Sequence, residues 1–157
     1  MTMAEQLLQL AKQMSHMDTP VLSVARRRAV STAYYAVFHA IAELCARDIL
    51  PDRDGPDNFR EFERVYRALE HGSLKNEFSK GPLKDNGQLK EIGELVVQLQ
   101  SERHKADYLP FGSYGIGGYT VAKLIESAGL AMELLKNLDA RDRRTLAVAL
   151  LFKNRPQ

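Results

Sequence analysis

One short stretch of the sequence, QSERHKADYLP at positions 100–110, holds the residues best suited to chemistry on a phosphate group. The segment before it repeats apolar residues at helical spacing: Leu89, Ile92, Val96 and Leu99. The next position of that series falls on Arg103, so the pattern turns a charged side chain toward the core. A guanidinium is planar, permanently charged and able to grip a phosphate through two parallel hydrogen bonds. Arg103 is therefore the leading candidate for a phosphate ligand.

Asp107 offers a second explanation for the inward arginine. It lies four residues after Arg103, so the two side chains share a face if the helix continues. Burying a guanidinium without a partner is costly, and a carboxylate can be that partner in a two-point pair. Two interpretations stay open. Either an Arg–Asp pair closes the end of a helix, or Arg103 stands in a groove open to an anion, with His104 and Tyr108 beside it.

A second polar group lies in the stretch RRRAVSTAYYAVFHA at positions 26–40. Steps of three and four residues place Arg28, Ser31, Tyr35 and His39 on one helical face. Tyr35 and His39 are then either core residues satisfied by hydrogen bonds or part of the polar seam of a binding groove.

His71 precedes a glycine and is expected at the C-terminal end of a helix. A histidine there complements the helix dipole, or it serves as a proton-transfer group, because its ordinary pKa lies near neutrality. The glycine-rich FGSYGIGGY lacks the lysine of a phosphate-binding P-loop. It predicts a flexible connection with Tyr114 or Tyr119 packing back.

The whole sequence predicts an all-α fold, an antiparallel bundle of four main helices plus one or two short helices in a single domain, 1–157. The expected helices span about 4–14, 21–50, 59–72, 88–105, 119–138 and 140–153, with caps expected at Asp18 or Thr19, at Asp57 or Asn58, and at Asp139. The second is the longest and carries a stripe of small residues, Ala29, Ala33, Ala36 and Ala40, which would let a partner helix approach closely.

The composition and charge of the chain exclude several classes of protein. A net charge of +2 permits phosphate contact without the strong basic bias of a dedicated nucleic-acid binder. The single cysteine, Cys45, excludes an internal disulfide and is expected to be buried. No metal-ligand spacing, signal peptide or membrane span is recognised, so we expect no metal or cofactor and a cytoplasmic protein.

The segments RRAVSTAYYAVFHAIAEL, RALEHG and ERHKADYLP together resemble the HEPN superfamily (higher eukaryotes and prokaryotes nucleotide-binding), over about 26–138. The similarity is to small bacterial members with an Arg-x-x-Ala-Asp-Tyr element. The resemblance implies an all-α bundle, a homodimer or a partner of a minimal nucleotidyltransferase, and binding of RNA or a nucleotide.

Active HEPN proteins are metal-independent ribonucleases, some of them toxins of toxin–antitoxin pairs, whose motif joins an arginine and a polar residue to a later histidine. By that resemblance Arg103 matches the motif arginine and His104 its polar position, while Tyr108 stands where a short-spaced motif has histidine. Tyrosine is a poor base at neutral pH. Cleavage would therefore need His104, His71 or His39 near the arginine.

Three functions are open on this basis. The leading hypothesis is an RNA- or nucleotide-binding protein in which Arg103 grips phosphate, Asp107 orients it and Tyr108 lines the groove. Arg28, Tyr35, His39 and His71 are further candidate contacts. The second is a metal-independent endoribonuclease with Arg103, His104, Asp107 and Tyr108 as its site. The third is a non-catalytic module that docks a nucleotidyltransferase or other protein through the alanine stripe.

Overall fold

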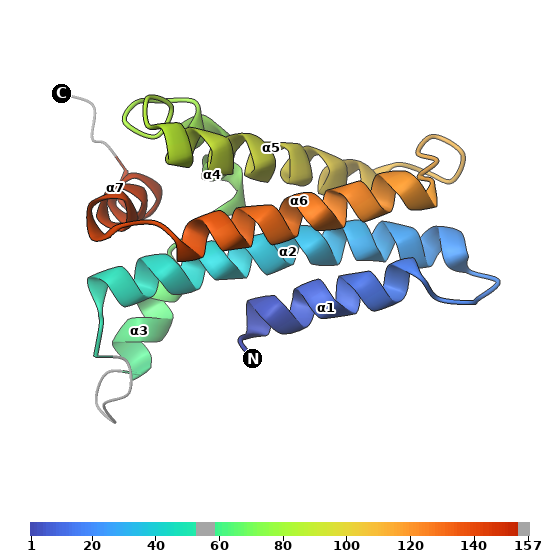
Figure 1. The fold of residues 1–157 in the computed structure, drawn as a ribbon, viewed down its shortest axis with the longest axis horizontal. Coiled ribbons are helices and arrows are strands. Elements are labelled where there is room, and N and C mark those ends of the chain that lie inside the picture. The colour runs from blue at the N-terminus through green and yellow to red at the C-terminus, as the bar shows by residue number, and fades with distance from the viewer. Residues whose placement is uncertain (53–58, 154–157) are drawn as a thin grey trace. The chain divides into compact units, whose positions relative to one another are not determined.

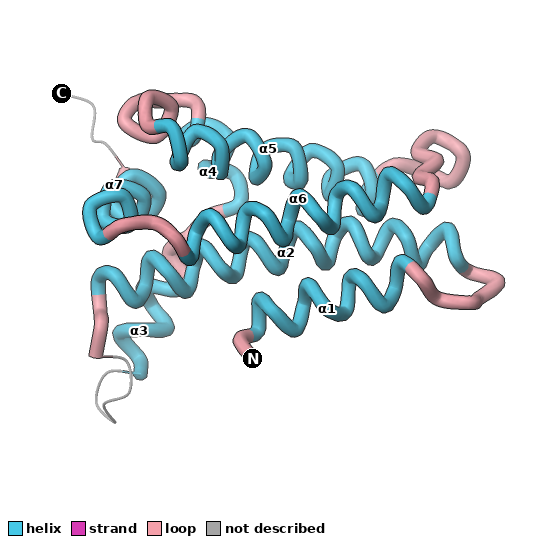
Figure 2. Tube along the Cα trace, in the orientation of Figure 1, coloured by secondary structure: helices cyan, strands magenta, loops and turns pink. Residues whose placement is uncertain are grey.

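The computed structural model describes residues 1–52 and 59–153, and in these ranges it is built from helices (Figures 1 and 2). The all-α fold class is thus confirmed. The helices in chain order are α1 (Met3–Ser15), α2 (Leu22–Ile49), α3 (Phe59–Tyr66), α4 (His71–Phe78), α5 (Gly87–Tyr108), α6 (Gly118–Lys136) and α7 (Ala140–Leu151).

The chain forms two compact units, and three of its helices continue from one unit into the other. The first unit comprises Met1–His39 and Leu95–Glu133, and the second comprises Ala40–Glu94 and Leu134–Gln157. The long helices α2, α5 and α6 each contribute residues to both.

The first unit is an antiparallel arrangement of α1 with parts of α2, α5 and α6. A capping box starts α1, because Thr2 accepts from the Glu5 amide and the Glu5 side chain accepts from the Thr2 amide. Arg28, near the start of α2, pairs with Asp107, near the end of α5, so these helices run in opposite directions. Figure 1 shows α1 lying along the N-terminal part of α2.

Small and aromatic residues of α2 form the core of the first unit. Those with no exposed surface are Ala29, Val30, Ala33, Tyr34, Ala36 and Val37. Three of the four alanines in the predicted docking stripe are among them, because the chain's own helices already cover that face. The helices that approach this stripe closely are therefore the chain's own, which leaves little of it exposed for the partner protein of the third hypothesis.

The second unit packs α3, α4 and α7 with the remaining parts of α2 and α5. Phe78 at the end of α4 approaches so near to Gly93 of α5 that a Cβ there would lie 2.7 Å from its ring. Asp139 caps α7 as expected, accepting from the Asp142 amide at 2.8 Å. Cys45 is fully buried, and burial, with a smaller effect of Asp48, raises the pKa of its thiol to about 12.

The predicted helix over 59–72 is two helices in the structure. The first, α3, ends at Tyr66, and α4 begins at His71 after Glu70 adopts an extended backbone. The break turns Leu69 inward, where it is 5% exposed. His71 thus begins a helix, and the expectation that it complements the dipole at a helix C-terminus is wrong. The caps expected at Asp57 or Asn58 lie outside the described residues.

One helix, α2, is long and apolar enough to cross a membrane by length and composition, contrary to the sequence expectation. Residues buried inside the protein make up 67% of the window that passes this test. The core helix of a soluble protein gives the same result, so the finding is weak evidence for a membrane span.

Candidate functional site

The candidate site forms where the start of α2 meets the end of α5 in the first unit. Asp107 lies between two arginines: its Oδ1 is 3.6 Å from Arg28 Nη2, and its Oδ2 is 3.7 Å from Arg103 Nη1. The Ser31 hydroxyl donates to the same Oδ2 at 3.3 Å. Because α5 extends to Tyr108, Asp107 stays in helical register with Arg103, as their spacing requires. We call Arg28, Ser31, Arg103 and Asp107 the Asp107 cluster.

Arg103 points inward, as the apolar rhythm of its helix predicts. Its side chain is 13% exposed, and that of Asp107 is 14% exposed. The guanidinium lies over two aromatic rings of α2, 5.1 Å from the centre of Tyr34 and 6.0 Å from that of Tyr35. Arg103 therefore makes both kinds of contact open to a guanidinium, an ion pair and packing against aromatic rings.

The Asp107 cluster carries more positive than negative charge and is not saturated by hydrogen bonds. One carboxylate serves two guanidinium groups, so its oxygens are divided between them and neither pair has the short two-point geometry expected from the sequence. Within the described chain, Arg103 Nε and Asp107 Oδ1 are buried without a hydrogen-bond partner. Such unsatisfied groups lower stability and are uncommon away from functional sites.

Arg27, which the sequence did not single out, has a different role from its neighbour Arg28. Its guanidinium donates to the carbonyls of Ala106, Leu109, Pro110 and Tyr114, at 3.3, 2.6, 3.2 and 3.3 Å respectively. Carbonyls at a helix C-terminus have no partner inside the helix, and a cation there also complements the dipole. Arg27 therefore anchors the end of α5 and the segment after it to α2.

Tyr114 packs back onto the first unit, whereas Tyr119 does not. The Tyr114 ring lies 5.6 Å from the Arg27 guanidinium, and its hydroxyl donates to Glu102 Oε2 at 2.7 Å. Burial, and then this hydrogen bond, raise the pKa of the Tyr114 hydroxyl. Tyr119 is 76% exposed. Of the two tyrosines proposed for this role, the structure selects Tyr114.

Arg26 completes a run of three arginines at the start of α2. Its Nη2 lies 3.2 Å from where a Cβ would stand on Gly118, the first residue of α6. Its Nε is also buried without a hydrogen-bond partner in the part of the chain that is described. The absence of a side chain at Gly118 thus makes room for a cation beside the first turn of α6.

His104 and Tyr108 lie outside the buried cluster. Both are exposed, Tyr108 by 67%, and their rings form a pair with centres 4.9 Å apart. They share a face of α5 that is one residue further around the helix than Arg103 and Asp107. Tyr108, which was expected to line the same groove as Arg103, instead forms an exposed ring pair with His104.

The other two candidate histidines differ in environment. His39 is half-buried in α2, its ring is 5.9 Å edge-on from that of Phe38, and burial lowers the pKa of its imidazole. His71 belongs to the second unit, at the start of α4. In the first unit, the contacts described for Arg103 are with Asp107, Tyr34 and Tyr35.

Tyr34, which the sequence analysis does not single out, supports the site. It is fully buried, and burial raises the pKa of its hydroxyl to about 12, although the Arg103 charge and a hydrogen bond with Arg103 act in the opposite direction. It therefore stays protonated at neutral pH and cannot accept a proton from a substrate there. Within the described residues, no three His, Cys, Asp or Glu side chains gather to hold a metal ion.

No protein-family model, curated protein or solved structure matches this chain.

Proposed function

We propose that this chain is a HEPN-like protein that binds RNA or a nucleotide, with the Asp107 cluster as its phosphate site. The observation that carries the proposal is the sharing of one carboxylate by two arginines. Arg103 and Arg28 together bring two positive charges against the single negative charge of Asp107. A cluster of this kind attracts an anion, and phosphate matches the fork of a guanidinium.

Arg28 and Arg103 have different parts in this proposal. Arg28 is 56% exposed and meets the ligand first, whereas Arg103 is 13% exposed and stabilises the bound charge from the inner side. Electrostatic attraction is stronger beside a partly desolvated cation than in open solvent. Asp107 pairs with both guanidinium groups in the free protein and competes with the bound phosphate for them.

The exposed ring pair of His104 and Tyr108 supports an RNA strand as the ligand. Bases stack on aromatic side chains with little sequence preference, and unpaired bases are free to do so. The pair lies one helical position from Arg103 and Asp107, so a phosphate at the Asp107 cluster leaves a neighbouring base within reach of the rings.

We propose binding and not cleavage as the activity. RNA self-cleavage needs a base for the 2′-hydroxyl and an acid for the leaving oxygen. The tyrosine nearest to the Arg103 guanidinium, Tyr34, is held protonated, and the tyrosine that replaces the motif histidine, Tyr108, is exposed to solvent. Neither provides a base beside the inward arginine.

Fluorescence anisotropy with a labelled oligouridylate, in EDTA, tests the proposal. Arg103→Gln is expected to weaken binding at least tenfold, and added salt is expected to weaken binding by the wild type. Arg47→Gln is the matched control, since Arg47 lies on α2 and its described ion pair is with Glu43. Equal affinities for wild type and Arg103→Gln would refute the site. Cleaved RNA in the same samples would refute binding alone and favour the ribonuclease.

The same resemblance leads us to propose that the chain forms a homodimer or pairs with a minimal nucleotidyltransferase. Light scattering of the purified chain measures its mass directly. A monomer at micromolar concentration would remove the homodimer from the proposal.

A further inference from the structure

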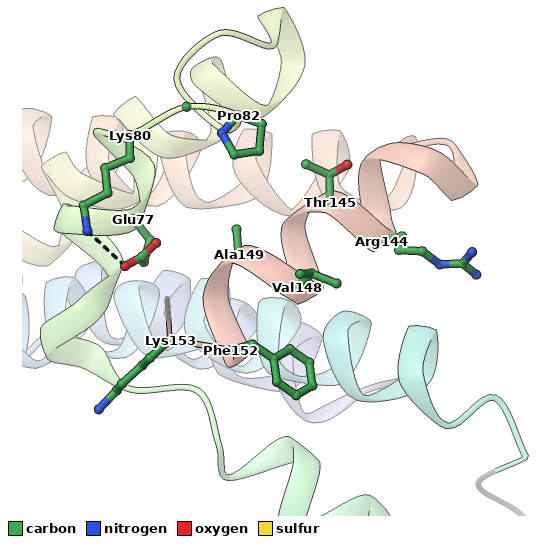
Figure 3. Close-up of a pocket in the computed structure, with 10 residues that line it drawn as sticks. Glu77, Lys80, Pro82, Arg144, Thr145, Val148, Ala149, Phe152 and Lys153 are labelled. Carbon is green, nitrogen blue, oxygen red and sulfur yellow. Dashed lines mark hydrogen bonds and ion pairs between the residues drawn. The ribbon is translucent and has the colours of Figure 1, made fainter. Parts of the chain in front are cut away.

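A groove lies between α4 and α7 in the second unit, and none of its lining residues belongs to the Asp107 cluster. Its larger part has a volume of about 420 Å³ and is bounded by the end of α4, the turn at Gly81 and Pro82, and one face of α7 (Figure 3). A smaller hollow of about 270 Å³ shares four lining residues with it: Glu77, Ala149, Phe152 and Lys153. We call the two together the α4–α7 groove.

The floor of this groove is an apolar face of α7 that the chain leaves uncovered. Val148 is 52% exposed and Phe152 is 59% exposed, whereas Leu146 and Leu150 on the other side of the same helix are buried. Figure 3 shows Val148 on α7 and Phe152 just past the C-terminal end of this helix. Exposed apolar side chains that line a hollow, with polar residues around them, are typical of a surface that binds a partner.

Cations surround the apolar floor. Lys80, Arg144 and Lys153 line the larger part, where Glu77 is the one carboxylate among the described lining residues. Glu70 and Glu77 both line the smaller part. All three cations are well exposed, by 60%, 76% and 81% respectively. Each forms one long surface ion pair: Lys80 with Glu77 at 3.4 Å, Arg144 with Asp48 at 3.9 Å and Lys153 with Glu70 at 3.4 Å. Exposed pairs contribute little, so Lys80 and Lys153 are available to a bound carboxylate. The pair of Arg144 is different, because the Asp48 side chain is only 11% exposed.

From this arrangement we infer that the α4–α7 groove binds an acidic peptide segment of a partner protein, anchored by a large apolar side chain. The apolar floor accepts the anchor against Val148 and Phe152, and Lys80, Arg144 and Lys153 pair with flanking carboxylates. This inference uses other residues than the proposed RNA site and does not depend on it.

A nucleic acid is the competing occupant, and the lining argues against it. A strand needs a track of cations for successive phosphates and rings for its bases. The groove instead offers one aromatic ring, at Phe152, beside Val148 and Ala149, with the cations at its edges. Apolar contact with flanking carboxylates is the chemistry of an amphipathic acidic peptide.

Selection from a displayed library of random peptides, about 12 residues long, against the full chain tests the inference. We expect enriched peptides to combine aspartate or glutamate with one bulky apolar residue. A synthetic copy of the most enriched peptide should bind Phe152→Ser and Arg144→Gln at least tenfold more weakly than the wild type. Amide shifts on titration should lie in α4 and α7.

Two variants serve as matched controls, and thermal melts check that every variant folds. Arg141→Gln removes an exposed arginine of α7 that does not line the groove, and Phe111→Ser removes an exposed phenylalanine of the first unit. Both should bind the peptide as the wild type does. Failure to enrich any acidic peptide, or equal binding by all variants, would overturn the inference. Binding of oligouridylate that Arg144→Gln abolishes would replace the peptide with a nucleic acid.

Discussion

The two units of this chain use charge in opposite ways. In the first unit charged side chains lie inward and join helices: Arg103 is 13% exposed and Asp107 is 14% exposed. In the second unit the buried residues of α4 and α7 are apolar, and the cations around their groove are exposed, Lys153 by 81%.

The difference indicates where a charged residue contributes to the stability of the folded protein. A partly buried charge must keep its partner, because losing the partner leaves a desolvated ion. An exposed pair exchanges its partner for water at almost no cost in free energy. Substitutions of the partly buried charges in the first unit should therefore change both stability and binding, whereas charge changes at Lys80 and Lys153 beside the α4–α7 groove should change binding alone.

The largest expected effect is that of Arg27→Ala in the first unit. This substitution removes four hydrogen bonds to carbonyls at and after the end of α5. Hydrogen bonds from a charged donor are worth about 1.5–3 kcal/mol each and are not additive, so we expect a loss of about 3 kcal/mol in the free energy of unfolding. Urea denaturation measures it.

Arg28→Ala is the matched control for Arg27→Ala, because it removes the adjacent arginine of the same helix. Arg28 is 56% exposed, and its described ion pair with Asp107 spans 3.6 Å. Its loss should cost less than about 1 kcal/mol. Equal losses for the two variants would contradict the assignment of Arg27 to structure and Arg28 to binding.

Asp107→Asn should change stability and RNA binding in opposite directions. Removing the charge leaves Arg103 partly buried without its ion pair, so we expect a loss of about 2 kcal/mol in the free energy of unfolding. The same change removes the carboxylate that competes with phosphate for two arginines, so affinity for oligouridylate should rise severalfold. A fall in affinity in a folded sample would show that Asp107 acts mainly by orienting the arginines.

Gly93→Ala tests the apolar packing of the second unit. The added Cβ would lie 2.7 Å from the Phe78 ring, and Phe78 is only 6% exposed. Overpacking of this kind typically costs about 1–3 kcal/mol, and we expect about 1.5 kcal/mol here after the gain in helix propensity. Gly72→Ala is the control, since its Cβ would meet nothing within 4 Å. A stability loss as large in Gly72→Ala would contradict the packing explanation.

Periodicity alone predicts the fold class and the inward Arg103. Spacing also places Asp107 beside it, because residues four apart share a helical face whatever the tertiary structure. Arg27 could not be found this way, since Leu109, Pro110 and Tyr114, whose carbonyls it contacts, lie more than eighty positions away. Only the packing of α2 against α5 distinguishes it from Arg26 and Arg28.

Two features of the structure have no signal in the sequence pattern. The glycine after His71 predicts the end of a helix there, yet the break lies earlier, at an extended Glu70 with no glycine or proline to mark it. Helical spacing also cannot show that the Arg103 guanidinium lies over the Tyr34 ring, because that contact depends on the packing of α2 against α5.

The smallest expected effect is a dependence of stability on pH through His39. Burial lowers the pKa of His39 in the folded protein below its ordinary value of 6.5. The unfolded chain therefore takes up a proton at a higher pH than the folded chain does. The stability due to neutral His39 is complete above pH 6.5 and is lost as the pH falls below that value toward the folded pKa.

Melting temperatures at about pH 7.5 and about pH 5.5 measure this dependence, with the shift expected to be smaller in His39→Gln than in the wild type. His16→Gln is the matched control, because His16 is exposed after α1 and should keep the wild-type shift. An identical shift in all three proteins would show that His39 is not the source of the acid sensitivity, and would contradict the prediction.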